Sequence, residues 1–198
     1  MLHRILGAFP PARYGGPRVI GWGLTTLCAV AASILLAPTG CGLFGAGLAL
    51  VMMAIAAVDA REFRIPNELV LLGVLSGLAE TAVVGSRPFA ALMSAVLRGA
   101  VLVILLMGFR SAYRFFRQRE GIGLGDVKLS AVAGVWLSWT TAALAIEFAG
   151  LVALIAVLIG SLGGKRISGA TQIPFGLFFA PAIWAGWLLD MVILHRII

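Results

Sequence analysis

Two aspartates stand at the borders of apolar segments, where a charged side chain is costly. Asp59 follows an apolar run and opens the stretch DAREFRIPN, and Asp126 lies in GIGLGDVKLS at the start of another run. An ionisable group in or beside a bilayer marks a functional site by default. If the two carboxylates share a site, they cannot both ionise easily, and the pair holds one proton between them. Such a pair supplies an acid and a base together, which can activate water to attack an amide.

Either aspartate alone has a simpler explanation, as a helix-end charge in the headgroup region or as an ion-pair partner of Arg61, Arg64 or Lys128. The helix ends indicate how a facing pair would divide its work. Asp126 opens an apolar segment, where the positive end of a helix dipole favours the anion, and Asp59 closes one, where the negative end disfavours it. Our hypothesis is that Asp126 is the charged base and that Asp59 holds the proton.

Three glycines precede Asp126 in the stretch GIGLGD. Gly121, Gly123 and Gly125 can take positive φ and leave no side chains in the way, so an extended substrate backbone can come close to Asp126. A flexible turn from loop to helix is the alternative. A dinucleotide-binding loop is excluded because no strand precedes these glycines.

The composition places these residues in a membrane protein. Among 198 residues, 61% are hydrophobic and 12% are charged, whereas about a quarter of a soluble domain is charged. Several apolar runs reach the roughly 20 residues that a helix needs to cross a bilayer, and the alternation typical of a barrel strand is missing. The sequence therefore predicts an all-α integral membrane protein.

Turn-forming breaks divide the chain into apolar runs, which predict a bundle of about seven transmembrane helices, between six and eight. The expected spans are Arg18 to Ala37, Gly42 to Val58, Glu68 to Gly85, Phe89 to Phe109, Asp126 to Leu137, Thr140 to Leu162, and Pro174 to Leu194. Residues 1–17 are expected to form a cytoplasmic tail, and residues 18–198 a single transmembrane domain. The first span resembles a cleaved signal sequence, but its apolar core exceeds the roughly 7 to 15 residues of such signals, so we expect it to be retained.

The basic residues indicate how the bundle is oriented. With the N-terminus in the cytoplasm, most arginines and lysines fall on the cytoplasmic side and only Arg87 and Arg196 face outward, in agreement with the positive-inside rule. The third and fourth spans separate the end of the second span from the start of the fifth. Asp59 and Asp126 are therefore expected at the same depth, at the cytoplasmic boundary.

The formal charge of +7 raises the question of a nucleic-acid partner, but its placement favours membrane lipid. Arginines in one hydrophilic connection lie beside aromatic residues, as at an interface with anionic lipid. They are Arg110, Arg114, Arg117 and Arg119. Cys28 and Cys41 form no CxxC pair, so we expect packing residues rather than a zinc site or a disulfide. No cofactor is predicted.

Three further charged residues lie inside the predicted spans. Glu80, Arg98 and Glu147 stand several residues from the outer ends of their spans, at similar depths. Because an unpaired charge there would be costly, we expect Arg98 to pair with Glu80, Glu147 or both, and to tie three helices together. A proton or ion path is the functional alternative.

Three stretches resemble motifs of the prepilin peptidases, which are membrane aspartic peptidases of the GxGD type. GIGLGDVKL resembles the GxGD motif itself, and Asp59 with the following RIPN resembles the motif of the first aspartate. QIPFGLFFAPA, which begins at Gln172, is similar to a C-terminal IPFGP segment, although Leu177 stands where proline is usual. The motifs occur in the family's order and cover most of the chain.

The resemblance implies a membrane-embedded endopeptidase that removes the short basic leader from prepilin or pseudopilin precursors, usually just after a glycine, at the cytoplasmic face of a bacterial inner membrane. It implies Asp59 and Asp126 as the catalytic pair. Other motif residues are expected at the substrate cleft: Ile65, Pro66, Asn67, Gly123, Gly125, Lys128, Pro174 and Gly176. We expect Asn67 to cap the helix that follows it, and Lys128 to hold a charged aspartate or meet a lipid phosphate.

One departure concerns the larger members of the family. They resemble this chain but add a loop with paired CxxC zinc ligands that serves N-methylation of the product, and this chain has no CxxC. We expect peptidase activity without methyl transfer and without a metal. Two rivals stay open: a transporter or assembly factor that binds cations or protons at the same aspartates, and a GxGD peptidase with other membrane substrates. The particular pilin and the oligomeric state do not follow from the sequence.

Overall fold

The computed structural model describes residues 17–37, 40–84, 87–118, 121–162 and 174–197. These residues form seven helices and no strand, so the predicted all-α fold is confirmed. The helices are α1 (Pro17–Leu36), α2 (Cys41–Glu62), α3 (Asn67–Val84), α4 (Pro88–Arg117), α5 (Leu124–Trp136), α6 (Trp139–Leu162) and α7 (Gly176–Ile197).

The helices match the predicted spans closely, but α2 and α4 continue beyond them. α2 ends at Glu62, whereas the predicted span ended at Val58. α4 continues to Arg117, whereas the predicted span ended at Phe109. Among the described helices, α2, α3, α4 and α6 are long and apolar enough to cross a membrane, and α1 and α7 contain shorter apolar stretches. Some of the predicted features lie outside the described residues, namely most of the N-terminal tail, Arg119 and Gln172.

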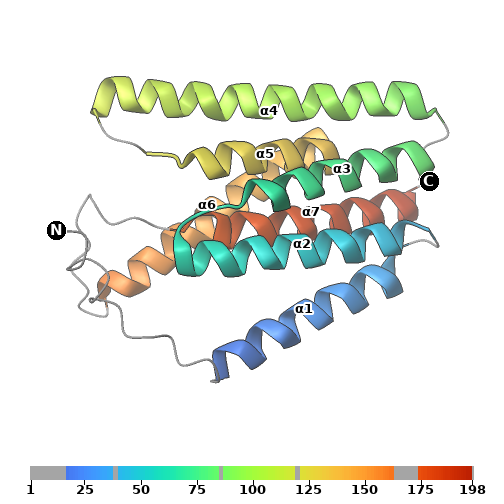
Figure 1. Cartoon of the computed structure of the whole chain (residues 1–198), viewed down its shortest axis with the longest axis horizontal. Helices are drawn as coiled ribbons and strands as arrows, with labels where there is room; N and C mark the ends of the chain where they lie inside the picture. The colour runs from blue at the N-terminus through green and yellow to red at the C-terminus, as the bar shows by residue number, and fades with distance from the viewer. Residues whose placement is uncertain (1–16, 38–39, 85–86, 119–120, 163–173, 198) are drawn as a thin grey trace.

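Four helices form the centre of the bundle (Figure 1). α2 packs against α3 and α7, and α5 packs against the same two helices, so the four close into a ring. The remaining helices lie outside this ring: α4 covers α3 and α5, α1 packs on α2, and α6 packs on α7. The ring brings together α2, α5 and α7, which carry the aspartates and the third motif.

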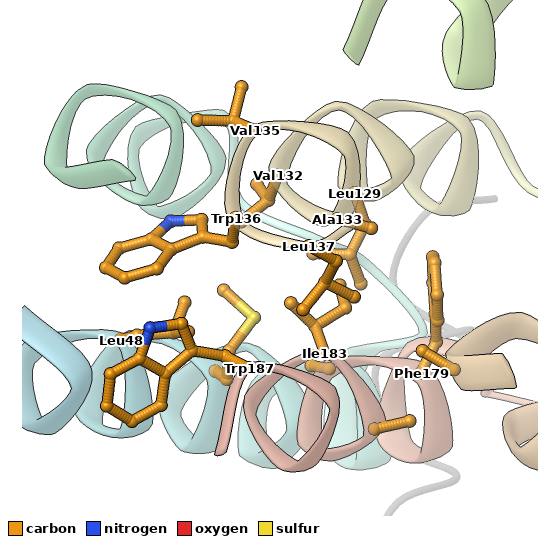
Figure 2. Packing of buried hydrophobic residues seen from close by; sticks show 14 of the residues in the cluster. Leu48, Leu129, Val132, Ala133, Val135, Trp136, Leu137, Phe179, Ile183 and Trp187 are labelled. Carbon is orange, nitrogen blue, oxygen red and sulfur yellow. The ribbon is translucent and has the colours of Figure 1, made fainter. Parts of the chain in front are cut away.

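The core lies where α5 faces α2 and α7 (Figure 2). Trp136 of α5 and Trp187 of α7 meet edge to face, with ring centroids 6.3 Å apart. Leu48, Leu129 and Ile183 pack in the same cluster and are fully buried. An edge-to-face aromatic pair adds about 0.5–1.5 kcal/mol beyond the burial of its surface. This core holds the short helix α5, and with it Asp126, against the rest of the bundle.

Glycines allow the helices to approach one another closely, as small residues do in membrane bundles. A Cβ atom at Gly45 of α2 would lie 1.8 Å from the ring of Trp187 in α7. A Cβ atom at Gly134 of α5 would lie 2.5 Å from the backbone of Gly99 in α4. These contacts exist only because neither position carries a side chain.

Several helix ends meet at one end of the bundle, among them the end of α2 and the starts of α3, α5 and α7 (Figure 1). α2 ends because Phe63 takes a left-handed conformation with φ 52°, and its N–H donates to the carbonyl of Asp59 at 3.0 Å. Residues 64–66 then lead into α3. The two predicted catalytic aspartates therefore lie at the same end of the molecule, as the order of the spans predicted.

Candidate active site

Asp59 lies in the last turn of α2, and only 5% of its surface is exposed. Its carboxylate accepts hydrogen bonds from the backbone N–H of Leu177, at 3.0 Å, and from that of Gly176. These are two of the first N–H groups of α7, which have no acceptor within their own helix. The start of α7 therefore fixes the position of the Asp59 carboxylate and favours its negative charge.

Asp126 is the third residue of α5, and 9% of its surface is exposed. Its carboxylate turns back to accept a hydrogen bond from the backbone N–H of Gly123, the N-cap residue of the helix. The third residue of a helix makes the same contact in a capping box. The Asp126 side chain is therefore held against the GIGLG loop that precedes it.

The structure brings the two carboxylates together. They are close enough for the charge of Asp59 to act on Asp126. Ile65 packs against Gly125, which precedes Asp126, and against Gly176, whose N–H binds Asp59. A Cβ atom at Gly125 would lie 3.0 Å from the Ile65 side chain, and one at Gly176 would lie 2.8 Å from it. Ile65 is itself buried. The ends of α2 and the starts of α5 and α7 therefore form one site around this isoleucine.

The hypothesis that Asp126 is the base and Asp59 the acid rested on the helix to which each residue belongs. In the structure both carboxylates accept N–H groups from helix N-termini, Asp59 from α7 and Asp126 from α5. The positive end of a helix favours either anion, so the helix ends do not distinguish the two residues. A proton shared between Asp59 and Asp126 belongs to the pair, so neither residue is assigned as the acid or as the base.

The glycines before Asp126 provide space and do not adopt positive φ. Gly123 has φ −67°, and among the described glycines only Gly40 has a positive φ. A Cβ atom at Gly121 would lie 2.5 Å from the ring of Tyr113, and one at Gly123 would lie 3.0 Å from the Asp126 carboxylate. The expectation of positive φ is therefore wrong, and close packing of the loop is the physical reason for these glycines.

Lys128 and Asn67 join the two aspartate motifs at the surface. Lys128 Nζ donates to Asn67 Oδ1 at 2.8 Å, and both residues are exposed. The expected capping by Asn67 is wrong, because Asn67 is the first residue of α3 and its side-chain oxygen accepts from Lys128. The carbonyl of Pro66 accepts the first helical bond, from the N–H of Val70 at 3.2 Å. Pro66 and Pro174 are half-buried.

The predicted ion pairing among Glu80, Arg98 and Glu147 is wrong. Glu80 is buried and accepts a hydrogen bond from Trp187 Nε1 at 3.3 Å, whereas Glu147 is exposed on α6. Arg98 donates to the carbonyl of Gly134 at 3.1 Å. The similar depths of the three residues did not make them partners, because depth along a helix does not fix the direction in which a side chain points.

Sequence reasoning missed Asp190, which joins helices at the opposite end of the bundle from Asp59. Its carboxylate accepts hydrogen bonds from the N–H of Ser138 at 3.0 Å and from the hydroxyl of Thr141 at 2.6 Å, at the start of α6. Its charge also acts on Arg98. An acidic residue inside an apolar span is a signal that the sequence did contain.

Arg110 also lies elsewhere than predicted. It was assigned to a connection facing lipid, but it belongs to α4 and only 7% of its surface is exposed. Its Nη1 donates to the carbonyl of Ile122, in the loop before Asp126. Arg114 and Arg117, further along the same helix, are exposed.

A groove of about 620 Å³ lies between α1 and α2, and apolar side chains such as Trp22, Leu50 and Met53 line it. The predicted site residues do not contribute to its lining. Within the described ranges, no group of three or more His, Cys, Asp or Glu side chains is placed to hold a metal ion. The chemical groups that the structure places at the candidate site are its two carboxylates and the backbone N–H groups that bind them.

Comparison with known proteins identifies the family. The model of the type IV leader peptidase family matches residues 46–162, which contain both aspartates. The chain belongs to this family. Among its relatives, the prepilin leader peptidase/N-methyltransferase of Aeromonas hydrophila is 30% identical over 171 residues, which cover 83% of this chain and 56% of that protein. The leader peptidase HopD of Escherichia coli is 32% identical over 131 residues, which cover 65% of this chain and 82% of that protein.

This leader peptidase family member spans about half the length of its longer relatives. The prepilin leader peptidase/N-methyltransferase of Burkholderia pseudomallei (strain 1026b), for example, is 30% identical over 152 residues, which cover 77% of this chain and 48% of that protein. No solved structure matches the chain. The family resemblance predicted from the motifs is confirmed.

Proposed function

We propose that this protein is a membrane-embedded aspartic endopeptidase that removes the short basic leader from type IV prepilin or pseudopilin precursors. The observation that carries the proposal is that the buried carboxylates of Asp59 and Asp126 lie close together, at the end of α2 and the start of α5. Membership of the type IV leader peptidase family supports the reaction and the class of substrate.

The proposed chemistry uses the two carboxylates as one unit. The ionised carboxylate takes a proton from a water molecule as that water attacks the carbonyl carbon of the scissile peptide bond, and the protonated carboxyl donates its proton to the carbonyl oxygen. When the tetrahedral intermediate collapses, one of its hydroxyl groups returns a proton to the ionised carboxylate as the C=O bond re-forms. The C–N bond breaks, and the leaving nitrogen takes up the proton of the other carboxyl group, so the pair again holds one proton. The N–H groups of Gly176, Leu177 and Gly123 hold the carboxylates in place during these steps.

We propose that the end of the bundle that holds Asp59 and Asp126, called the site end below, faces the cytoplasm. Its exposed basic residues support this orientation through the positive-inside rule. They are Arg61, Arg64, Arg114, Arg117 and Lys128. The apolar helix of a precursor would then lie in the bilayer beside the bundle, with its leader junction at the depth of the two aspartates.

The test is processing of a candidate prepilin by the purified full chain in proteoliposomes, followed by mass measurement of the product. Asp59→Asn and Asp126→Asn preserve the size of the side chain but cannot exchange a proton, so each is expected to lower the rate by a factor of about 10² or more. Glu147→Gln, which alters an exposed acid on α6, is the matched control and should cleave normally.

Retention of cleavage in either asparagine variant, with normal insertion in the membrane, contradicts the proposal. A transporter that uses the same aspartates would leave the precursor intact with the wild-type chain as well. The product mass also reports whether the new N-terminus is methylated, and we expect an unmethylated product.

A further inference from the structure

Arg110 stands out among the basic residues at the site end because it is buried. Only 7% of its surface is exposed, whereas Arg114, on the next turn of α4, is exposed. One of its contacts is a hydrogen bond from Nη1 to the carbonyl of Ile122. A guanidinium group is a planar cation with several N–H donors, so a buried arginine places a positive charge and fixed donors at this point of the loop.

The peptide unit that accepts this hydrogen bond is the same unit that binds Asp126. The carbonyl of Ile122 and the N–H of Gly123 belong to one peptide bond, and that N–H donates to the Asp126 carboxylate. A continuous series of hydrogen bonds therefore runs from the guanidinium, through one planar peptide, to the carboxylate. Hydrogen bonds in series polarise one another, so the arginine makes the N–H of Gly123 a better donor to an anion.

A second contact fixes the same loop to α4. Tyr113 lies three residues after Arg110, on the same face of the helix, and its ring fills the space at Gly121, where a Cβ atom would lie 2.5 Å away. Two neighbouring side chains of α4 thus hold the loop on either side of Ile122. α4 contributes no predicted catalytic residue, yet it determines where the peptide in front of Asp126 lies.

We propose that Arg110 is a positioning residue for Asp126, and that it acts through the peptide unit between Ile122 and Gly123. The expected effect of Arg110 on catalysis rests on the proposed peptidase function. Its expected effect on the Asp126 carboxylate does not. Loss of the guanidinium leaves the carbonyl of Ile122 without its charged donor, and the peptide is free to rotate away from Asp126.

The kinetic experiment compares Arg110→Gln and Arg110→Lys with the exposed control Arg114→Gln in the prepilin processing assay. We expect Arg110→Gln to lower kcat roughly tenfold to a hundredfold, the cost of misplacing a catalytic group, with KM little changed. Arg110→Lys, which keeps a cation and N–H donors, should recover part of kcat, and Arg114→Gln should match the wild type. An unaltered kcat in Arg110→Gln, or equal loss in Arg110→Lys, overturns the proposal.

A spectroscopic experiment needs no substrate and separates this inference from the peptidase proposal. The chain contains three aspartates, Asp59, Asp126 and Asp190, so a ¹³C label in the aspartate carboxyl gives three signals, and the Asp126 signal is assigned by its loss in Asp126→Asn. In folded protein in micelles, Arg110→Lys and Arg110→Gln should move the Asp126 signal and leave that of Asp190 unchanged. An Asp126 signal that stays at its wild-type position in both variants refutes the coupling, whether or not the chain cleaves a precursor.

Discussion

At the scale of single residues, the position of Asp59 depends on a helix that begins far along the chain. Its hydrogen-bond donor Leu177 lies 118 residues later, and the preceding residue, Gly176, has no room for a side chain. A Cβ atom at Gly176 would lie 2.9 Å from Asp59 Oδ2 and 2.8 Å from Ile65 Cδ1. The smallest residue at this point lets the start of α7 come into contact with the carboxylate.

Gly176→Ala should therefore impair catalysis without preventing insertion. The added methyl group must push the Asp59 carboxylate or the first turn of α7 aside, and a displacement of this size at a reacting group costs roughly tenfold or more in rate. Gly150→Ala places the same methyl group in open space on α6 and is the control. The measurement is the processing rate of each variant at the same amount of membrane-inserted protein. Equal rates for Gly176→Ala and Gly150→Ala would contradict the proposed role of Gly176.

The motifs predicted Asp59 and Asp126 as candidate catalytic residues, because charged residues in an apolar chain are conspicuous in the sequence. The contact between Asp59 and the start of α7 was not predictable in this way, because the donors are backbone N–H groups, which every residue except proline has. The role of Arg110 was hidden for a different reason. Composition treats all the arginines near the end of α4 alike, and only the helix geometry turns one of them inward.

At the scale of the elements, glycine and tryptophan determine how closely the central helices pack. Trp187 of α7 occupies the space over Gly45 of α2 and donates to the Glu80 carboxylate of α3. Trp136 of α5 donates to the carbonyl of Gly73, also in α3, at 2.7 Å. Both indole N–H groups thus find acceptors inside the bundle, and the rings fill the space that the glycine leaves.

Gly45→Ala and Gly47→Ala form a matched pair in α2. The first places a methyl group 1.8 Å from a ring carbon of Trp187, and the second places it where nothing lies within 4 Å. We expect Gly45→Ala to destabilise the fold by about 1–3 kcal/mol through overpacking, and Gly47→Ala to be neutral or to stabilise it by up to about 1 kcal/mol through helix propensity. Thermal unfolding in detergent measures both, and a similar rise in melting temperature for the two variants would show that α2 and α7 do not pack in this way.

The helix boundaries show which part of an element the sequence can predict. Apolar runs between breaks located the seven helices of the described residues, and most of these runs approach the roughly 20 residues that a membrane span requires. α5, with 13 residues, was located by the breaks on either side of it. The apolar-run criterion ended α4 at Phe109, since the segment RSAYRFFR that follows is basic and aromatic. A helix does not have to end where its apolar run ends, and α4 continues to Arg117 through a segment with no glycine or proline to stop it.

At the scale of the whole molecule, the bundle exposes apolar side chains on its outer helices. α4 and α6 present large hydrophobic residues to the surroundings, among them Leu97, Ile104, Phe109, Leu151, Leu154 and Leu158. Such a surface suits lipid and not water. With α1, these helices surround the central ring, so the polar site is accessible mainly from the end of the bundle where α2 ends and α5 and α7 begin.

Arg61→Cys and Arg87→Cys test the orientation of this surface, in a chain whose own Cys28 and Cys41 are replaced by alanine. Arg61 lies at the site end and Arg87 at the start of α4, at the opposite end, and both are exposed. Because cytoplasmic loops are enriched in arginine and lysine, we expect a membrane-impermeant maleimide to label Arg87→Cys in intact cells and Arg61→Cys only after lysis. The reverse pattern would place the site on the outer face and exclude leader cleavage in the cytoplasm.

The dependence of Asp59 on α7 has a consequence for biosynthesis. The ribosome makes Asp59 and Asp126 before it reaches Leu177, so at one stage of synthesis both aspartates exist while the N–H donors of the Asp59 carboxylate are not yet translated. A nascent chain at that stage has the acidic pair without the completed site. We infer that the site is complete only when α7, the last described helix, has been made and packed against α2.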